Sequence, residues 1–161
     1  MITMTALLDL LTAAEVERVV RACADAGCPT LVALSVTGDV QLVPADPLDA
    51  TVRDAFNAHQ RRTVDGRRLL GPDAPSFVAA AFERHGATVR ARPSPWRLGR
   101  DQPGLTGAWL RGWVGAAAEQ RPELAGDLAT YEHRRRAEID AGRLDVVVHH
   151  SDLLVAYDQL G

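Results

Sequence analysis

The sequence predicts an α/β fold, and two observations lead to that class. A continuous apolar run at residues 30–36 lacks polar alternation, which is typical of a strand buried on both faces of a parallel sheet. A strand-like segment at residues 2–8 and a helix-like segment precede that run, so the chain opens strand, helix, strand. Apolar residues make up 47% of the 161 residues and charged residues 24%, which excludes a disordered chain.

The expected helices follow from start signals and periodicity. Thr12 and Glu15 have the spacing of a capping box at the start of the first helix. A second, short helix is expected at 48–60, and a third at 75–86, where a proline opens the first turn and a glycine ends the helix. Two further helices are expected within 99–142.

The remaining segments are expected to be strands and turns. Residues 87–92 alternate apolar and basic, which indicates a half-exposed strand near an edge. Residues 144–157 predict a long strand with a bend near its middle. The first buried strand is expected to end at a turn at 37–39, and 63–73 is expected to be a loop. The arginines at 134–136 are expected to face solvent.

Composition excludes several classes of function. The net charge is −3 and the isoelectric point about 5.9, so no basic field exists to hold nucleic acid or an anionic membrane. All 18 cationic residues are arginine, which excludes Schiff-base and P-loop lysine chemistry. No apolar run approaches the roughly 20 residues of a membrane span, the start lacks a signal-peptide pattern, and only two cysteines are present. A cytoplasmic location is therefore expected.

A polar cluster on the second helix is the first candidate site. Phe56, His59 and Gln60 share one helix face, and Asn57 lies beside them. Such a group can bind a carboxylate or transfer a proton near neutral pH, with His59 as a candidate base. The alternative is a polar helix end in contact with solvent.

Two weaker candidates follow. Trp96, flanked by Arg92 and Arg97, could cover a substrate, and the alternative is a packing tryptophan beside solvated arginines. The pair His149 and His150 cannot ligate one metal from a regular strand, because neighbouring side chains point to opposite faces. A polar strand end or bend is favoured there, and no metal is expected.

Five blocks of sequence, taken in order, resemble the C-terminal half of class I S-adenosylmethionine-dependent methyltransferases. They are TALLDLLTAAEVE, ALSVTGDVQLVPADPLDATVRDAFNAHQRR, RLLGPDA, RPSPWRLG and the segment that starts WLRGWVGAAAEQRPEL. The resemblance covers essentially the whole chain. No block is itself a catalytic signature.

The resemblance implies a Rossmann-like sheet with strand order 4-5-7-6, strand 7 antiparallel and helices on its faces. Residues 2–8 resemble strand 4, 30–36 strand 5, 87–95 strand 6 and 144–156 strand 7. The chain is then one partial domain over 1–161, with a helical lid insertion at 99–142.

The resemblance also implies the cofactor and the site. S-adenosylmethionine would contact Thr5, Ala6 and Leu7 where strand 4 ends, and the acceptor would contact Asn57, His59, Gln60 and Trp96. The family's glycine-rich loop and ribose-binding acid precede strand 4 and have no counterpart in this sequence. Cofactor binding is therefore expected to need an N-terminal half encoded separately, or a homodimer formed through the strand at 2–8.

The sequence leaves three functions open. The first is methyl transfer to a small acceptor, for which the surrounding arginines favour an anion. The second is a non-enzymatic binding or regulatory module that keeps half of the fold and associates through its exposed strand edge. The third, a small hydrolase using His59 or the 149–152 segment, lacks a nucleophile elbow.

Overall fold

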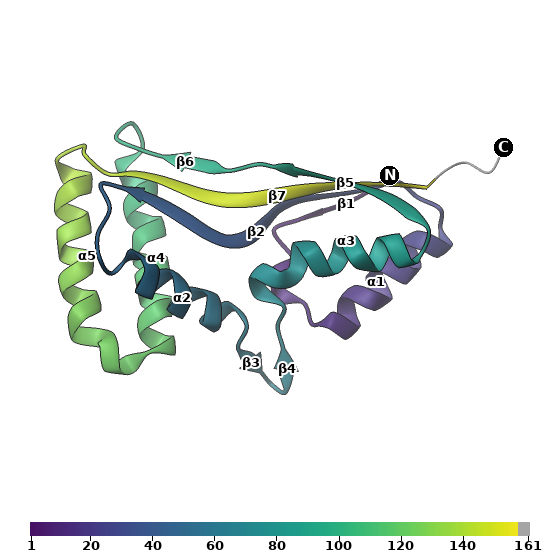
Figure 1. Ribbon diagram of the computed structural model, residues 1–161, viewed down its shortest axis with the longest axis horizontal. Helices are drawn as coiled ribbons and strands as arrows, with labels where there is room; N and C mark the ends of the chain where they lie inside the picture. Colours follow the sequence, from purple (N-terminus) through teal and green to yellow (C-terminus); the bar gives the residue numbers. More distant parts are fainter. Residues whose placement is uncertain (158–161) are drawn as a thin grey trace. The chain divides into compact units, whose positions relative to one another are not determined.

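The computed structural model describes residues 1–157 and shows an α/β fold with a mixed sheet, as the sequence predicts. Strands β1 and β2 are parallel, whereas β5 and β6 both run antiparallel to β7 (Figure 1). The sheet order is β1-β2-β7-β5, and β3 and β4 form a separate hairpin. The strands are β1 (Ile2–Thr5), β2 (Thr30–Val43), β3 (Thr63–Val64), β4 (Arg67–Arg68), β5 (Ala87–Pro93), β6 (Trp96–Leu98) and β7 (Asp145–Tyr157).

The described chain divides into two compact units, each with its own core. The first unit contains residues 1–38, 60–95 and 149–157, and the second contains 39–59 and 96–148. Strands β2 and β7 contribute residues to both units. The expected domain boundary at 161 lies outside the described residues.

In the first unit, two helices pack on each other and against the sheet (Figure 1). They are α1 (Ala13–Asp25) and α3 (Ala74–Arg84), with the short 3-10 turns η1 (Leu8–Leu10) and η2 (Gly71–Asp73) before them. The core combines the buried helix faces with the inward residues of β2 and β7. Its largest buried side chains are Phe82, Leu8, Leu153, Val16, Val20 and Val32.

The start of α1 confirms the expected capping box. The Thr12 hydroxyl accepts a hydrogen bond from the Glu15 backbone N–H at 3.2 Å, and the Thr12 N–H donates to the Glu15 carboxylate at 2.9 Å. Val16, Val20 and Cys23 follow at helical spacing and are buried. The local sequence therefore fixes both the start of this helix and its buried face.

The expected loop at 63–73 is wrong, because this segment contains a hairpin and η2. Thr63 pairs with Arg68 and Val64 with Arg67, which leaves a two-residue loop. Both loop residues have positive φ, 51° at Asp65 and 75° at Gly66. That is the requirement of a type I′ turn, for which Asp-Gly is a favoured pair.

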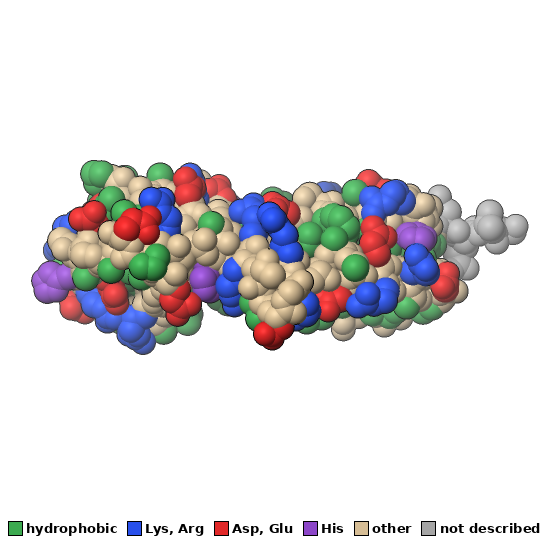
Figure 2. Space-filling view, turned by 90° about the horizontal axis from the view of Figure 1, so that it is seen from below, with side chains coloured by type: hydrophobic (Ala, Val, Ile, Leu, Met, Phe, Trp, Pro, Cys, Tyr) green, Lys and Arg blue, Asp and Glu red, His purple; other side chains and the backbone are tan. Residues whose placement is uncertain are grey.

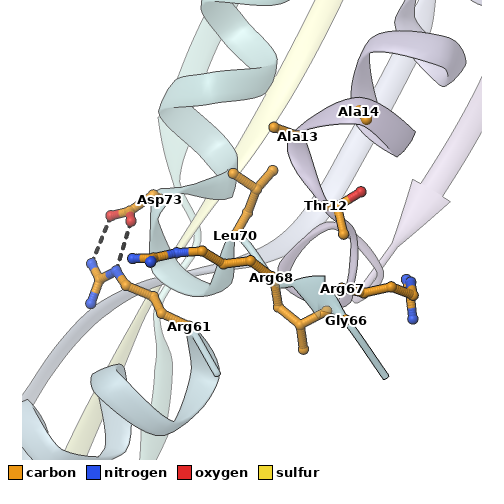
Figure 3. A pocket seen from close by; sticks show the side chains of 10 residues that line it. Thr12, Ala13, Ala14, Arg61, Gly66, Arg67, Arg68, Leu70 and Asp73 are labelled. Carbon is orange, nitrogen blue, oxygen red and sulfur yellow. Dashed lines mark hydrogen bonds and ion pairs between the residues drawn. The ribbon is translucent and has the colours of Figure 1, made fainter. Parts of the chain in front are cut away.

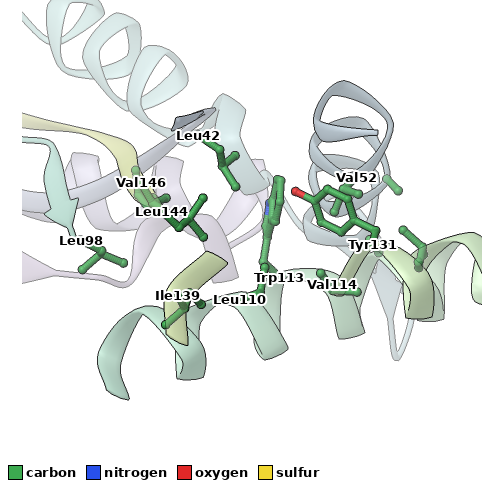
Figure 4. Close-up of a cluster of buried hydrophobic side chains, with 14 residues drawn as sticks. Leu42, Val52, Leu98, Leu110, Trp113, Val114, Tyr131, Ile139, Leu144 and Val146 are labelled. Atoms are coloured by element: carbon green, nitrogen blue, oxygen red, sulfur yellow. The ribbon is translucent and has the colours of Figure 1, made fainter. Parts of the chain in front are cut away.

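The second unit is mainly helical. It contains α2 (Asp49–Gln60), α4 (Pro103–Gln120), the 3-10 turn η3 (Pro122–Leu124) and α5 (Ala125–Asp140), although Gln60 itself belongs to the first unit. Helices α4 and α5, with η3 between them, lie in the segment 99–142, where two helices are expected. Trp113 and Tyr131 lie at the centre of its core (Figure 4). Their ring centroids are 6.3 Å apart, and Trp109 stacks on Trp113 at 5.0 Å.

The expectation that all of 134–136 faces solvent is wrong for Arg135, which is 0% exposed. Its guanidinium contacts the Asp49 carboxylate at 2.6 Å, the Glu138 carboxylate at 2.7 Å and the Pro44 carbonyl at 2.8 Å. The Tyr131 hydroxyl also donates to Asp49, at 2.7 Å. Burial raises the pKa of Tyr131, and the acceptor Asp49 raises it further. This cluster joins α5 to the start of α2.

The expected turn at 37–39 is also wrong, because β2 continues through it to Val43. Leu34 and Gly38 instead adopt positive φ, 55° and 79°, while remaining within the strand. Such left-handed residues occur at β-bulges, which bend a strand without ending it. In β7 the buried positions change phase between His150 and Leu153, at the expected bend.

The surface has no large area of a single charge on the face shown in Figure 2, where arginines and acidic residues are interspersed. Within residues 1–157, no helix is both long and apolar enough to cross a membrane.

Candidate functional site

The carboxyl end of β1 and the adjoining part of β2 carry an unusual backbone. Ala6, with φ of 50°, takes the chain out of β1, and its N–H donates to the Ala33 carbonyl at 3.1 Å. Leu34, the next residue of β2, has φ of 55°. The left-handed conformation costs a non-glycine residue about 1–2 kcal/mol. Such residues concentrate at functional sites, which favours this level of the sheet as the candidate site.

Asp152 of β7 binds two other segments at this level. Its carboxylate accepts a hydrogen bond from the Leu34 N–H at 2.9 Å and one from the Ser94 hydroxyl at 2.7 Å. Ser94 also donates its backbone N–H to the His150 carbonyl at 2.9 Å. One carboxylate therefore links β2, β7 and the residues that follow β5.

The direction of β7 relative to β2 follows from the same contacts. Leu34 lies opposite Asp152, and the Thr37 hydroxyl donates to the His149 carbonyl at 3.1 Å. Residue numbers fall along β7 as they rise along β2, so the two strands are antiparallel here.

A pocket of about 290 Å³ opens beside these contacts, entirely within the first unit. Thr37 of β2, Arg92 and Pro93 of β5, and 149–151 of β7 line it. The Nε2 atom of His149 is buried and has no hydrogen-bond partner in the described part of the chain. His149 as a residue also lines the pocket, and because buried polar atoms are usually hydrogen-bonded, its orphaned nitrogen is an exception in this part of the fold.

A second, larger pocket of about 540 Å³ lies between the start of α1 and the β3–β4 hairpin (Figure 3). Two of its arginines are already paired. Arg61 forms two hydrogen bonds of 2.6 Å with Asp73, and Arg67 contacts Glu15 at 2.8 Å. Arg68 lies across the pocket near Asp73 (Figure 3).

The pKa shifts agree with that pairing. The hydrogen bond from Arg61 lowers the pKa of Asp73. The hydrogen bonds from Arg67 and from the Thr12 N–H lower the pKa of Glu15 to about 2. Both carboxylates are held ionised, so the Arg67–Glu15 pair fastens the hairpin to α1, and the Arg61–Asp73 pair fastens the segment before the hairpin to the start of α3. We interpret this pocket as a structural joint rather than as a binding site.

The residues expected to contact cofactor lie in the first unit. Thr5 ends β1, Ala6 forms the left-handed exit described above, and Leu7 follows with 41% of its surface exposed. Together they present one hydroxyl and two apolar side chains. Gln60 belongs to the same unit, where its backbone packs against Gly71: a Cβ added there would lie 3.0 Å from the Gln60 carbonyl carbon.

The other expected acceptor residues lie in the second unit. His59 Nε2 is 3.0 Å from Glu119 Oε2 of α4, and the exposed fractions of the two side chains are 16% and 75%. Asn57 lies two residues earlier on α2. Trp96 begins β6, pairs with Val148 of β7 and is partly exposed. The structure thus gives His59 an acidic partner that the sequence pattern did not predict.

The sequence pattern also missed the residues that organise the bend of β7. Asp152 and Ser94 stand 58 positions apart, and no local pattern predicts their hydrogen bond. The signal in the sequence is the polar run at 149–152 inside an apolar strand, and that run predicts a strand end or bend rather than a site.

No protein-family model matches the chain, and no curated protein sequence matches it significantly. Across residues 1–157, no group of three or more histidine, cysteine or acidic side chains is placed to hold a metal ion.

Proposed function

We propose that the chain is the acceptor-binding, C-terminal portion of an S-adenosylmethionine-dependent methyltransferase. The observation that carries the proposal is the strand order β1-β2-β7-β5, with β1 parallel to β2 and β7 antiparallel to β5. This order is the one that the family resemblance implies, 4-5-7-6 with strand 7 antiparallel. The expected lid segment contains α4 and α5, which supports the same assignment.

The residues at the end of β1 do not by themselves fit the whole cofactor. S-adenosylmethionine carries ribose hydroxyls and an ammonium group, which require carboxylate or carbonyl acceptors in an apolar setting. Thr5, Ala6 and Leu7 provide an apolar wall and one hydroxyl. The remaining cofactor contacts belong, in this proposal, to a glycine-rich segment that pairs with the outer edge of β1. The chemistry of methyl transfer would therefore need both halves.

A binding test can examine this proposal without the second half. Isotope-labelled chain is titrated with S-adenosylhomocysteine, and the backbone amide resonances are followed by NMR. We expect weak binding with shift changes concentrated at Thr5, Ala6, Leu7 and the neighbouring Ala33. Changes confined to other parts of the chain, or none at all, would contradict cofactor contact at this edge.

Two leucines of one segment provide a matched pair for the same titration. Leu7 and Leu10 are 41% and 51% exposed, so truncation of either one should not disturb the core. Leu7→Ala should weaken the binding of S-adenosylhomocysteine, and Leu10→Ala should leave it unchanged. If neither variant changes the affinity for S-adenosylhomocysteine and the chain still associates through β1, the non-enzymatic module becomes the better proposal.

A further inference from the structure

We propose that the pocket lined by β2, β5 and β7 binds a small organic monocarboxylate. The pocket has a volume of about 290 Å³ and lies entirely in the first unit. This is close to the lower end of the range found for small-molecule sites, about 300 Å³. Three strands contribute to its wall, so its shape is set by the sheet rather than by a loop.

Arg92 supplies the positive charge. Its guanidinium donates to the Ala91 carbonyl at 2.9 Å, and none of the ion pairs found within residues 1–157 includes Arg92. Most of its donors are therefore available to a ligand. A guanidinium fork matches the two oxygens of a carboxylate, which favours that group over a neutral one.

His149 also lines the pocket, and its imidazole contains an orphaned nitrogen. Its Nε2 is buried without a partner in residues 1–157, while its carbonyl accepts from Thr37. The Thr37 contact and the two hydrogen bonds to Asp152 fix the backbone around the pocket. A preorganised wall of this kind lowers the entropic cost of binding.

The charges beside the pocket disfavour a phosphate dianion more than a monoanion. Asp152 is the cross-strand partner of Arg92, so a second negative charge lies close to the pocket. That carboxylate repels any anion, but it repels a phosphate dianion about twice as strongly as a monoanion, and Arg92 is the one arginine among the lining residues that could balance the charge. Ala91 and Pro93 add apolar lining suited to an organic body.

This inference goes beyond the proposed function, because the pocket contains none of the residues expected to contact the cofactor or the methyl acceptor. The test therefore uses benzoate as the probe, with no cofactor present. If benzoate does not bind, the prediction for S-adenosylhomocysteine at β1 is unaffected. If S-adenosylhomocysteine does not bind at β1, the benzoate result is unaffected.

Benzoate and the nearly isosteric neutral compound benzamide are titrated separately into the labelled chain. We expect benzoate to shift the amide resonances of Thr37, Arg92 and 149–151, and benzamide to bind at least about tenfold more weakly, as loss of one charged hydrogen bond implies. Equal binding of the two compounds, no binding of benzoate, or shifts centred on Arg68 would overturn the proposal.

Two arginines of β5 form a matched pair. Arg92→Gln should weaken benzoate binding about tenfold or more. Arg90 lies two residues away on the same face of β5, outside the pocket, and Arg90→Gln removes the same charge. This variant should change the affinity for benzoate less than about twofold, since exposed charges are strongly screened. If Arg90→Gln weakens benzoate binding as much as Arg92→Gln does, the affinity depends only on the net charge of the strand and the proposed site is wrong.

Discussion

At the scale of single residues, Arg135 is the most constrained charge in the described chain. Its side chain is 1% exposed and contacts the carboxylates of Asp49 and Glu138. Removing one partner of a buried ion pair leaves the other charges uncompensated, which costs about 3–5 kcal/mol. The arginine therefore sets how α5 is fastened to the start of α2.

Replacement of this arginine should be strongly destabilising. We expect Arg135→Met to lower the free energy of unfolding by about 3–5 kcal/mol, measured by chemical denaturation. Arg136→Met is the matched control, because Arg136 is 40% exposed and pairs with Glu132 on the helix surface. It should cost less than about 1 kcal/mol. Equal losses in the two variants would show that the buried network contributes nothing specific.

Glu15 predicts a dependence of stability on pH. Arg67 and the Thr12 N–H lower its pKa from 4.5 to about 2 in the folded chain. A depressed folded pKa means that this stabilisation is complete above about pH 4.5 and is lost as the pH falls through about 2. We expect Glu15→Gln to flatten the fall in melting temperature across that interval.

Arg67→Gln removes the donor rather than the acceptor and should flatten the same interval. A melting profile that stays as steep as that of the unchanged chain in both variants would contradict the assigned role of this pair. The steepness that remains should come from other carboxylates, including Asp73, whose pKa is lowered by its bond to Arg61.

At the scale of elements, two glycines should respond to alanine in opposite directions. Gly66 has φ of 75° and open space where a Cβ would stand, so the penalty of Gly66→Ala is backbone strain alone, about 1 kcal/mol. Gly112 lies in α4 with open space around it, so Gly112→Ala should stabilise by about 0.5–1 kcal/mol. Chemical denaturation measures both, and a change of the same sign in the two variants would contradict this account.

Most elements could be located from the sequence because their signals are local. The capping box of Thr12 and Glu15 confirms this for α1, and α2 and α3 begin within a residue of their expected starts. The Asp65-Gly66 pair also carries a turn signal, but the strands beside it have only two residues each, which is too short for strand periodicity to appear.

The errors arose where long-range contacts decide the outcome. The Thr37-Gly38-Asp39 sequence has the local chemistry of a turn, yet Thr37 bonds to β7 and the strand continues. Arg135 is buried because it bonds to Asp49 and Pro44. Both partners are more than 80 positions away in the sequence, so no local pattern predicts these contacts. The pocket around His149 depends on such contacts too, and so the candidate site was harder to predict than the fold.

At the scale of the whole molecule, the order of the strands leaves β1 at one end of the sheet in the described residues. Ile2 donates its N–H to the Pro29 carbonyl and Ala6 to the Ala33 carbonyl, so the even-numbered residues of β1 bond to β2. In a parallel pair, the alternate residues Thr3 and Thr5 direct their N–H and C=O groups to the other edge. That edge is a template for another strand.

We expect the purified chain to self-associate through this edge at high concentration. Thr3→Pro removes one outward donor and keeps the hydrogen bonds to β2, because proline is tolerated in edge strands. It should shift the sedimentation profile towards the monomer, whereas Thr3→Val retains the N–H and should not. Circular dichroism checks that both variants fold. A chain that remains monomeric at all concentrations, or Thr3→Pro with unchanged association, would show that β1 does not recruit a strand, and the pairing invoked for the cofactor-binding half would lose its physical basis.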